Sequence, residues 1–157
     1  MAKKIEKTQA ITQEGYDELV AELEEAKKKQ QEIINKVQIA REDGDLSENA
    51  PYHAAREELS YINGHIDELE SILKTAVITE NTSKNNIGIG TRVRITNKEN
   101  DKVIEGTLVG PSEADFAAGK ISADSPIGKA IMGKKSGAVV TVKAPKGDAK
   151  YKVEIIK

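Results

Sequence analysis

Four carboxylates fall within seven consecutive residues of this 157-residue sequence. These residues are Glu42, Asp43, Asp45 and Glu48. Gly44 lies among them and permits a tight turn. The three-residue spacing of Asp45 and Glu48 allows two interpretations. It fits a capping box at the start of a helix, where Ser47 is also a suitable N-cap residue. Alternatively, Asp45 and Glu48 point outward and bind a metal ion together with another protein.

Magnesium suits the second interpretation, because it prefers oxygen ligands and takes only one or two carboxylates from a protein. Two carboxylates are too few to hold the ion tightly alone, so this segment would complete a magnesium site supplied mainly by a partner. His53 and Glu57 have the i, i+4 spacing of metal ligands on a helix, but they lack a third ligand nearby. We therefore expect His53 and His65 to lie on the flanks of helices.

Two heptad patterns flank the acidic segment and predict the element that positions it. Small or apolar residues recur at spacings of three and four, with one polar member, Gln30. The first set is Tyr16, Leu19, Leu23, Ala26, Gln30, Ile33, Val37 and Ala40; the second is Tyr52, Ala55, Leu59, Ile62, Ile66, Leu69, Leu73 and Ala76. The sets mirror each other about Leu46, so large residues face small ones. This register indicates an antiparallel hairpin within one chain rather than a dimeric zipper.

The first helix is expected to begin after Thr12, a suitable N-cap, and to run from about residue 13 to 42. Pro51 is tolerated only in the first turn of a helix and disfavours helical angles at Ala50, so we expect the second helix to start slightly late. The charged outer faces are typical of solvated coiled-coil surfaces.

Charge divides the chain into two parts. Residues 1–79 hold 10 basic and 17 acidic residues, whereas residues 80–157 hold 14 and 9, so the overall charge of −2 is a cancellation. We predict an N-terminal coiled-coil domain over residues 1–79 with its acidic tip near 43–49, a polar linker over 80–86, and a C-terminal domain over 87–157. The predicted fold class is α+β.

The C-terminal part reads as a small α+β domain. Alternating apolar residues predict strands over 91–96, 103–109, 138–143 and 151–156. Ser125 is the expected N-cap of a short helix that has Pro126 at its first position and Gly133 after its end.

Composition excludes several classes of protein. With no cysteine, the chain has no disulfides, no thiolate zinc site and no cysteine nucleophile. It has no run of 18 apolar residues and no apolar stretch behind its basic start, so we expect neither a membrane span nor a secretory signal, and a cytoplasmic location. Aromatic residues make up only 3%, which argues against a base-stacking surface for single-stranded nucleic acid.

Two motifs resemble the bacterial Gre transcript cleavage factors, most closely those of the GreA type. The first is Gly44-Asp45-Leu46-Ser47-Glu48-Asn49-Ala50 followed by Tyr52-His53-Ala54-Ala55-Arg56; the second spans residues 121–134 and includes Asp124-Ser125-Pro126. The resemblance covers nearly the whole chain in matching order. Pro51 departs from it, because the family more often has an acidic or other helix-compatible residue there.

The resemblance implies a function. The coiled coil is expected to enter the secondary channel of RNA polymerase and to stimulate cleavage of the RNA 3′ end after backtracking, so that elongation resumes. Asp45 and Glu48 match the family's two tip acids, which help to hold a Mg²⁺ ion jointly with the polymerase and orient the attacking water. The chain is then a monomeric cofactor of the polymerase's own activity, not an enzyme, and binds no cofactor alone.

The resemblance also implies contact residues. Arg41, Ser47, Asn49 and Arg56 flank the tip acids, where they would contact RNA or polymerase; Arg41 and Arg56 alternatively form surface ion pairs along their helices. An FKBP-like C-terminal domain is expected to bind the rim of the secondary channel on the largest polymerase subunit. Asp124, Ser125 and Pro126 match the contact loop, although helix capping also explains them.

Three other functions are alternatives to transcript cleavage. A channel-binding inhibitor of the same fold would differ at the tip acids. A prolyl isomerase or peptide-binding chaperone needs an aromatic-lined pocket, and the C-terminal domain has only Phe116 and Tyr151. A plain coiled-coil scaffold would leave both motifs unexplained. In the family that the chain resembles, members that release longer fragments carry a larger basic patch on the coil, so the acidic N-terminal half here favours release of short RNA fragments.

Overall fold

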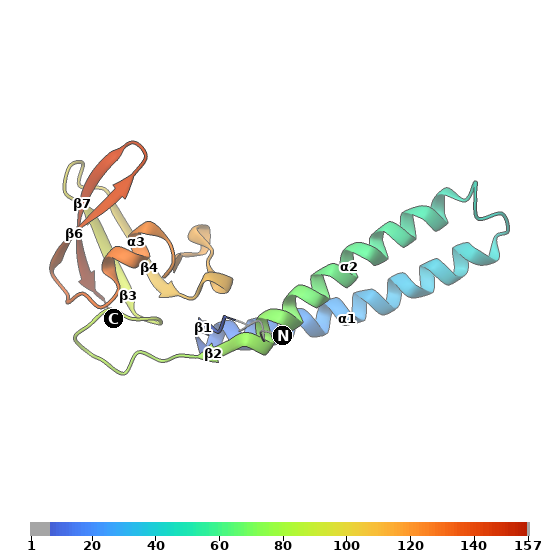
Figure 1. The fold of residues 1–157 in the computed structure, drawn as a ribbon, viewed down its shortest axis with the longest axis horizontal. Helices are drawn as coiled ribbons and strands as arrows, with labels where there is room; N and C mark the ends of the chain where they lie inside the picture. Colours follow the sequence, from blue (N-terminus) through green and yellow to red (C-terminus); the bar gives the residue numbers. More distant parts are fainter. Residues whose placement is uncertain (1–6, 157) are drawn as a thin grey trace, which may run out of the picture. The chain divides into compact units, whose positions relative to one another are not determined.

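The computed structural model describes residues 7–156, and the chain divides into two compact units. One unit is the helical hairpin between Asp17 and Thr75; the other combines the segment that ends at Tyr16 with the chain from Ala76 onward (Figure 1). A helical hairpin followed by a β-rich domain confirms the predicted α+β class. The contacts divide the chain at different residues from the predicted boundaries at 79 and 87, because strands β1 (Gln9–Ile11) and β2 (Ala76–Ile78) pair with each other in the β-rich unit.

The hairpin is formed by helices α1 (Gln13–Glu42) and α2 (Ala50–Thr75). At about 1.5 Å per residue, the 30 residues of α1 span roughly 45 Å. Thr12 caps α1 as predicted, since its Oγ1 accepts a hydrogen bond from the Gly15 N–H at 3.0 Å. The predicted heptad positions from Leu19 to Leu73 are all buried or half-buried. The most deeply buried are Leu19, Ala26, Ile33 and Ala40 on α1 and Ala55, Ile62, Ile66 and Leu69 on α2.

The one polar heptad position also has a partner across the hairpin. The Gln30 Nε2 donates a hydrogen bond to the Asn63 Oδ1 at 2.7 Å. Asn63 is next to Ile62, the residue that the mirror pattern places opposite Gln30. The two helices are therefore paired in the predicted register.

Two short strands that the sequence analysis did not predict form a separate parallel sheet. Strand β1 (Gln9–Ile11) pairs with β2 (Ala76–Ile78), and Ile11 is fully buried. Ala76, predicted as the last heptad position, is instead the first residue of β2. The β-branched Val77 and Ile78 favour the extended backbone, and three-residue strands are too short to show an alternating pattern.

Glu113 holds the start of α1 to the 3₁₀ turn η1 (Pro111–Glu113). Its carboxylate accepts hydrogen bonds from the Thr12 N–H at 2.9 Å, from the Thr12 hydroxyl, and from the Gly110 N–H at 3.4 Å. All of these groups belong to the β-rich unit.

We expect Glu113→Ala to lower the free energy of unfolding by about 1.5–3 kcal/mol, because the Thr12 and Gly110 donors lose a charged acceptor. Urea unfolding of the full chain, followed by circular dichroism, measures this loss. Glu99→Ala is the matched control, since the exposed Glu99 side chain has no partner among residues 7–156, and its effect should stay within about 0.5 kcal/mol. Equal stability of the two variants would contradict a stabilising role for Glu113.

The β-rich unit is built on a five-stranded sheet with the order β5-β4-β3-β7-β6. Its strands are β3 (Arg92–Asn97), β4 (Val103–Val109), β5 (Lys120–Ser122), β6 (Ala138–Ala144) and β7 (Gly147–Ile155). Neighbouring strands are antiparallel except β4 and β5, which are parallel. The four predicted strands are confirmed, whereas β5 and the turn η2 (Phe116–Ala118) were not predicted.

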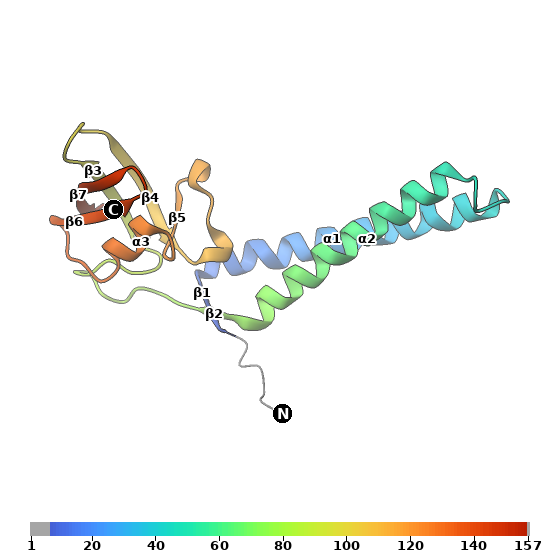
Figure 2. The ribbon, with the colours of Figure 1, turned by 45° about the horizontal axis from the view of Figure 1, so that its top comes forward.

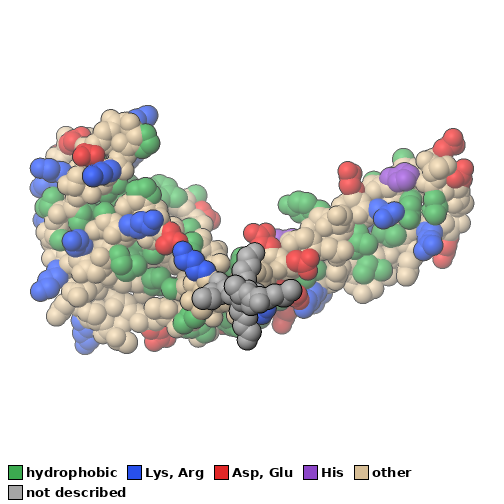
Figure 3. All heavy atoms as spheres, in the orientation of Figure 1, with side chains coloured by type: hydrophobic (Ala, Val, Ile, Leu, Met, Phe, Trp, Pro, Cys, Tyr) green, Lys and Arg blue, Asp and Glu red, His purple; other side chains and the backbone are tan. Residues whose placement is uncertain are grey.

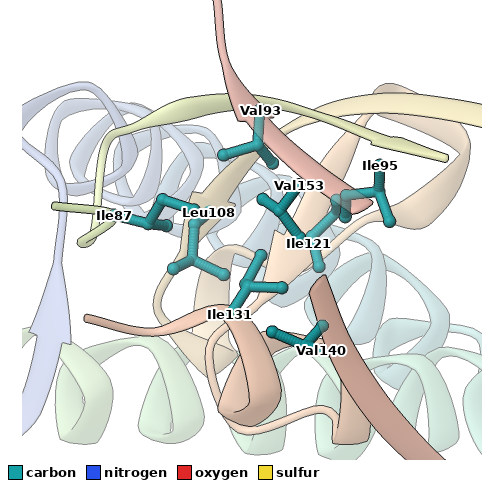
Figure 4. Close-up of a cluster of buried hydrophobic side chains, with 8 residues drawn as sticks. All are labelled: Ile87, Val93, Ile95, Leu108, Ile121, Ile131, Val140 and Val153. Atoms are coloured by element: carbon teal, nitrogen blue, oxygen red, sulfur yellow. The ribbon is translucent and has the colours of Figure 1, made fainter. Parts of the chain in front are cut away.

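Helix α3 (Pro126–Ile131) covers one face of this sheet (Figure 2). Its Ile131 belongs to a cluster of eight buried side chains, all of which are aliphatic (Figure 4). The cluster consists of Ile87, Val93, Ile95, Leu108, Ile121, Ile131, Val140 and Val153. Burying each such side chain contributes roughly 1.5–3 kcal/mol, which sets the position of α3 on the sheet. Tyr151 packs against this cluster, whereas Phe116 is 67% exposed.

Candidate functional site at the hairpin tip

The tip is the seven-residue loop 43–49 between α1 and α2. Gly44 has a φ of 108°, a left-handed conformation that favours glycine, and this residue lets the chain reverse just after α1 ends. Acidic side chains gather at the loop end of the hairpin (Figure 3). The loop therefore presents carboxylates to solvent at the end of a helical pair.

Asp45 is exposed, yet one of its carboxylate oxygens is fixed. Its Oδ1 accepts hydrogen bonds from the Ser47 hydroxyl at 2.8 Å and from the Ser47 backbone N–H at 3.1 Å. Its Oδ2 has no partner among the described residues, so this oxygen is available to an external ligand. The hydrogen bond from the Ser47 hydroxyl, followed by that from its backbone, lowers the pKa of the Asp45 carboxyl below its ordinary value.

We expect Ser47→Ala to raise the pKa of Asp45 toward its ordinary value, because the stronger of the two donors is lost. A lowered pKa keeps the carboxylate charged to lower pH. Its stabilising effect is therefore present above the pKa of the unfolded chain and is lost as pH falls through the folded value. An NMR titration of the Asp45 carboxyl carbon measures the change. Ser60→Ala, at an exposed serine on α2, should leave the titration unchanged. An unaltered Asp45 titration in Ser47→Ala would show that the hydroxyl does not act on this carboxylate.

Glu48 is exposed and has no hydrogen-bond or ion-pair partner within residues 7–156. The capping interpretation of Asp45 and Glu48 is therefore wrong, because the two residues stand before the helix rather than at its cap. Asn49 is the N-cap of α2: its Oδ1 accepts a hydrogen bond from the Tyr52 N–H at 3.1 Å. Ser47, the other candidate N-cap, binds Asp45 instead.

Pro51 does not delay the second helix. α2 begins at Ala50, so Pro51 occupies its second position, where the missing N–H would have no partner within the helix. The expectation of a late start was wrong because the first turn accommodates proline, and Ala50 is helical despite preceding it.

The two arginines beside the tip are exposed and free of ion pairs in the described part of the chain. Arg41 is the basic residue in the last turn of α1. The guanidinium of Arg56 lies 5.8 Å from the centre of the Tyr52 ring, a cation–π contact that orients it. The alternative of ion pairs along their helices is therefore not seen, and both charges are available to an anionic partner.

The histidines lie on the helix flanks, as expected. His53 packs edge-on against the Tyr52 ring, with 5.6 Å between ring centres, and His65 contacts the Glu22 carboxylate across the hairpin at 3.0 Å. Within residues 7–156, no three His, Asp or Glu side chains come together as metal ligands. Asp45 and Glu48 nevertheless offer carboxylate oxygens of the kind that magnesium prefers.

The predicted contact loop in the β-rich unit is partly a helix cap. The Ser125 Oγ accepts a hydrogen bond from the Gly128 N–H at 3.1 Å and donates one to the Ser122 carbonyl at 2.6 Å. The Asp124 N–H donates to the Ser122 Oγ at 3.2 Å, while the Asp124 and Pro126 side chains are exposed. Ser125 thus holds the loop, and its two neighbours face solvent.

Comparison with known proteins gives consistent matches over both parts of the chain. The family model "Transcription elongation factor, N-terminal" matches residues 9–78, and "Transcription elongation factor, GreA/GreB, C-term" matches residues 82–157. Transcription elongation factor GreA of Thermotoga sp. (strain RQ2) is 45% identical over 145 residues, which cover 91% of this chain and 93% of that protein.

Two further proteins are similar to this chain over most of its length. The GreA protein of Thioalkalivibrio sulfidiphilus is 43% identical over 151 residues, covering 94% of this chain and 96% of its own length. Among solved structures, GreA factor homolog 1 (Gfh1) of Thermus thermophilus is 32% identical, with 96% of this chain and all of that chain covered and a TM-score of 0.46.

Proposed function

Because this chain belongs to the GreA/GreB family of transcription elongation factors, we propose that it reactivates RNA polymerase whose transcript has slid backward. In this proposal, the hairpin enters the secondary channel and its tip meets the extruded RNA 3′ end. The polymerase then cleaves that end and elongation resumes. The chain acts as a monomer in the cytoplasm. Within the described residues, no helix is long and apolar enough to cross a membrane.

The proposal rests on the exposure and hydrogen bonding of the two tip carboxylates, those of Asp45 and Glu48. Asp45 offers a free Oδ2 on a carboxylate that Ser47 orients and keeps charged, and Glu48 is exposed without an internal partner. Such groups are poorly explained as structural, because neither caps a helix. They fit a role as oxygen ligands that complete a site on a partner.

The tip residues then have distinct roles. Asp45, through Oδ2, and Glu48 are the two carboxylates that would hold Mg²⁺ jointly with the polymerase and orient the attacking water. The chemistry that such an ion would supply is activation of this water for attack on the RNA phosphodiester. Arg41 and Arg56 face RNA phosphates or acidic polymerase elements. Most of the catalytic power belongs to the polymerase, so the chain stimulates an existing activity and binds no metal tightly alone.

The β-rich unit provides the second contact. We assign it to the rim of the secondary channel on the largest polymerase subunit. The exposed Asp124 and Pro126 side chains are the contacting groups, and Ser125 fixes the backbone between them by capping α3. In this proposal, the loop of Asp124, Ser125 and Pro126 serves both to cap α3 and to bind polymerase.

A stalled, backtracked complex tests the proposal directly. Purified bacterial RNA polymerase with 3′-end-labelled RNA is mixed with this protein and Mg²⁺, and released fragments are resolved by electrophoresis. We expect short 3′ fragments and renewed elongation when nucleotides are added. Slower RNA synthesis without fragments would instead identify a channel-binding inhibitor and overturn the proposal.

A further inference from the structure

Asn49 joins the two helices at the tip through a single side chain. Its Nδ2 donates a hydrogen bond to the Ala40 carbonyl in the last turn of α1 at 2.6 Å. Its Oδ1 accepts one from the Tyr52 N–H in the first turn of α2 at 3.1 Å. We call these two hydrogen bonds the Asn49 clasp. Asn49 is half-buried, whereas its neighbours Glu48 and Ala50 are exposed.

The Asn49 clasp provides hydrogen-bond partners for backbone groups at both helix ends. The last carbonyls of α1 and the first N–H groups of α2 have no partners within their own helices. An amide side chain carries a donor and an acceptor on one carbon, so Asn49 satisfies one group of each kind. An aspartate would cap α2 equally well, but it could not donate to Ala40.

Asn49 fixes both ends of the loop that contains the tip acids Asp45 and Glu48. Asp45 and Glu48 lie between Glu42, where α1 ends, and Asn49. Both are exposed, so packing does not fix them, and the Ser47 hydrogen bonds act only within the loop. The other hydrogen bond from the loop to α1 joins the Asp43 N–H to the Ala40 carbonyl at a long 3.4 Å.

We propose that Asn49 is a positioning residue, whose clasp fixes the ends of the tip loop and thereby places Asp45 and Glu48 for cleavage. This role replaces direct contact with RNA or polymerase, because the amide groups are used within the hairpin. The part concerning cleavage rests on the proposed function; the part concerning loop order does not.

The test compares Asn49→Asp with Asn35→Asp. Asn49→Asp keeps the cap on α2 and removes the donor to Ala40. Asn35→Asp makes the same chemical change at an exposed site on α1, so it controls for the added charge. Circular dichroism verifies that both variants keep their helices.

The first measurement is made on the free protein. We expect ¹⁵N order parameters for residues 43–48 of about 0.85 in wild type and Asn35→Asp. In Asn49→Asp we expect them to fall below about 0.6. Unchanged order parameters in Asn49→Asp would overturn the proposal, since the clasp would not hold the loop. The order parameters test whether Asn49 orders the loop even if the wild-type protein stimulates no cleavage. In that case only the proposed function fails.

The second measurement uses the backtracked polymerase complex. We expect Asn49→Asp to lower the maximal cleavage rate by roughly 10- to 100-fold, the range seen when groups that orient ligands are lost, with unchanged affinity for polymerase. A loss of affinity with an ordered loop would instead make Asn49 a contact residue. A mobile loop with a normal cleavage rate would show that the clasp does not serve cleavage. Either result would overturn the proposal.

Discussion

We expect Asp45→Ala and Glu48→Ala each to lower polymerase-dependent RNA cleavage by about 100-fold or more, and neither to change the affinity of the protein for polymerase. The reason is that the two carboxylates are exposed and make no contacts that stabilise the helices. If the proposed shared metal site exists, their loss would remove ligands from it and leave the hairpin and the β-rich unit intact. Cleavage rates at saturating protein, measured beside equilibrium binding to the same complex, separate the two effects.

Asp43→Ala is the matched control for these variants. Asp43 is an exposed acid in the same loop, and its described hydrogen bond uses the backbone N–H rather than the carboxylate. We expect its cleavage rate to stay near that of wild type. Cleavage by the Asp45→Ala/Glu48→Ala double variant at the wild-type rate would refute a role for the tip acids.

We expect Gly128→Ala to lower both the stability of the protein and its affinity for polymerase. A methyl group at this buried position of α3 would lie 2.0 Å from the Ser122 carbonyl oxygen and 2.9 Å from the Ala123 Cα. Both atoms are backbone, so α3 must move away from the strand end. We expect a loss of about 1–3 kcal/mol in the free energy of unfolding, the usual cost of overpacking.

The same displacement should weaken polymerase binding, because Ser125 caps α3 and holds Asp124 and Pro126 in place. Lys129→Ala, at the next and exposed residue, controls for stability and should stay within about 0.5 kcal/mol of wild type. Urea unfolding gives the stability, and fluorescence anisotropy at a temperature where Gly128→Ala remains folded gives the affinity. Tight binding by a destabilised Gly128→Ala would mean that the contact loop does not depend on α3.

The hairpin could be predicted from the sequence because its signal is long. Sixteen heptad positions in mirrored order determine helix type, register and turning point, and α1 has the predicted bounds of Gln13 and Glu42. The strands β1 and β2 could not be predicted in this way. Each has three residues, and their partners lie more than 60 residues away, so local patterns do not reveal the pairing.

The tip illustrates a different limit. Residue types and spacing identified Asp45, Ser47 and Glu48, and the family resemblance added Asn49. Neither could assign hydrogen bonds among several polar side chains in one short loop. Asn49 caps α2 although Asp45 and Ser47 were equally good caps by residue type. Which of these residues caps α2 depends on where α1 ends, because only Asn49 also donates a hydrogen bond to the Ala40 carbonyl. The Asn49 clasp depends on the positions of both helix ends in space, which residue types and spacing do not give.

The most direct test of the central claim is the Mg²⁺ concentration that gives half-maximal cleavage in the backtracked complex. If Glu48 contributes to a shared magnesium site, Glu48→Gln, which keeps the side-chain shape and removes the charge, should raise that concentration by about tenfold or more. Asp43→Asn should leave it unchanged. An identical Mg²⁺ requirement for Glu48→Gln and wild type would contradict the claim that the tip carboxylates complete the polymerase metal site.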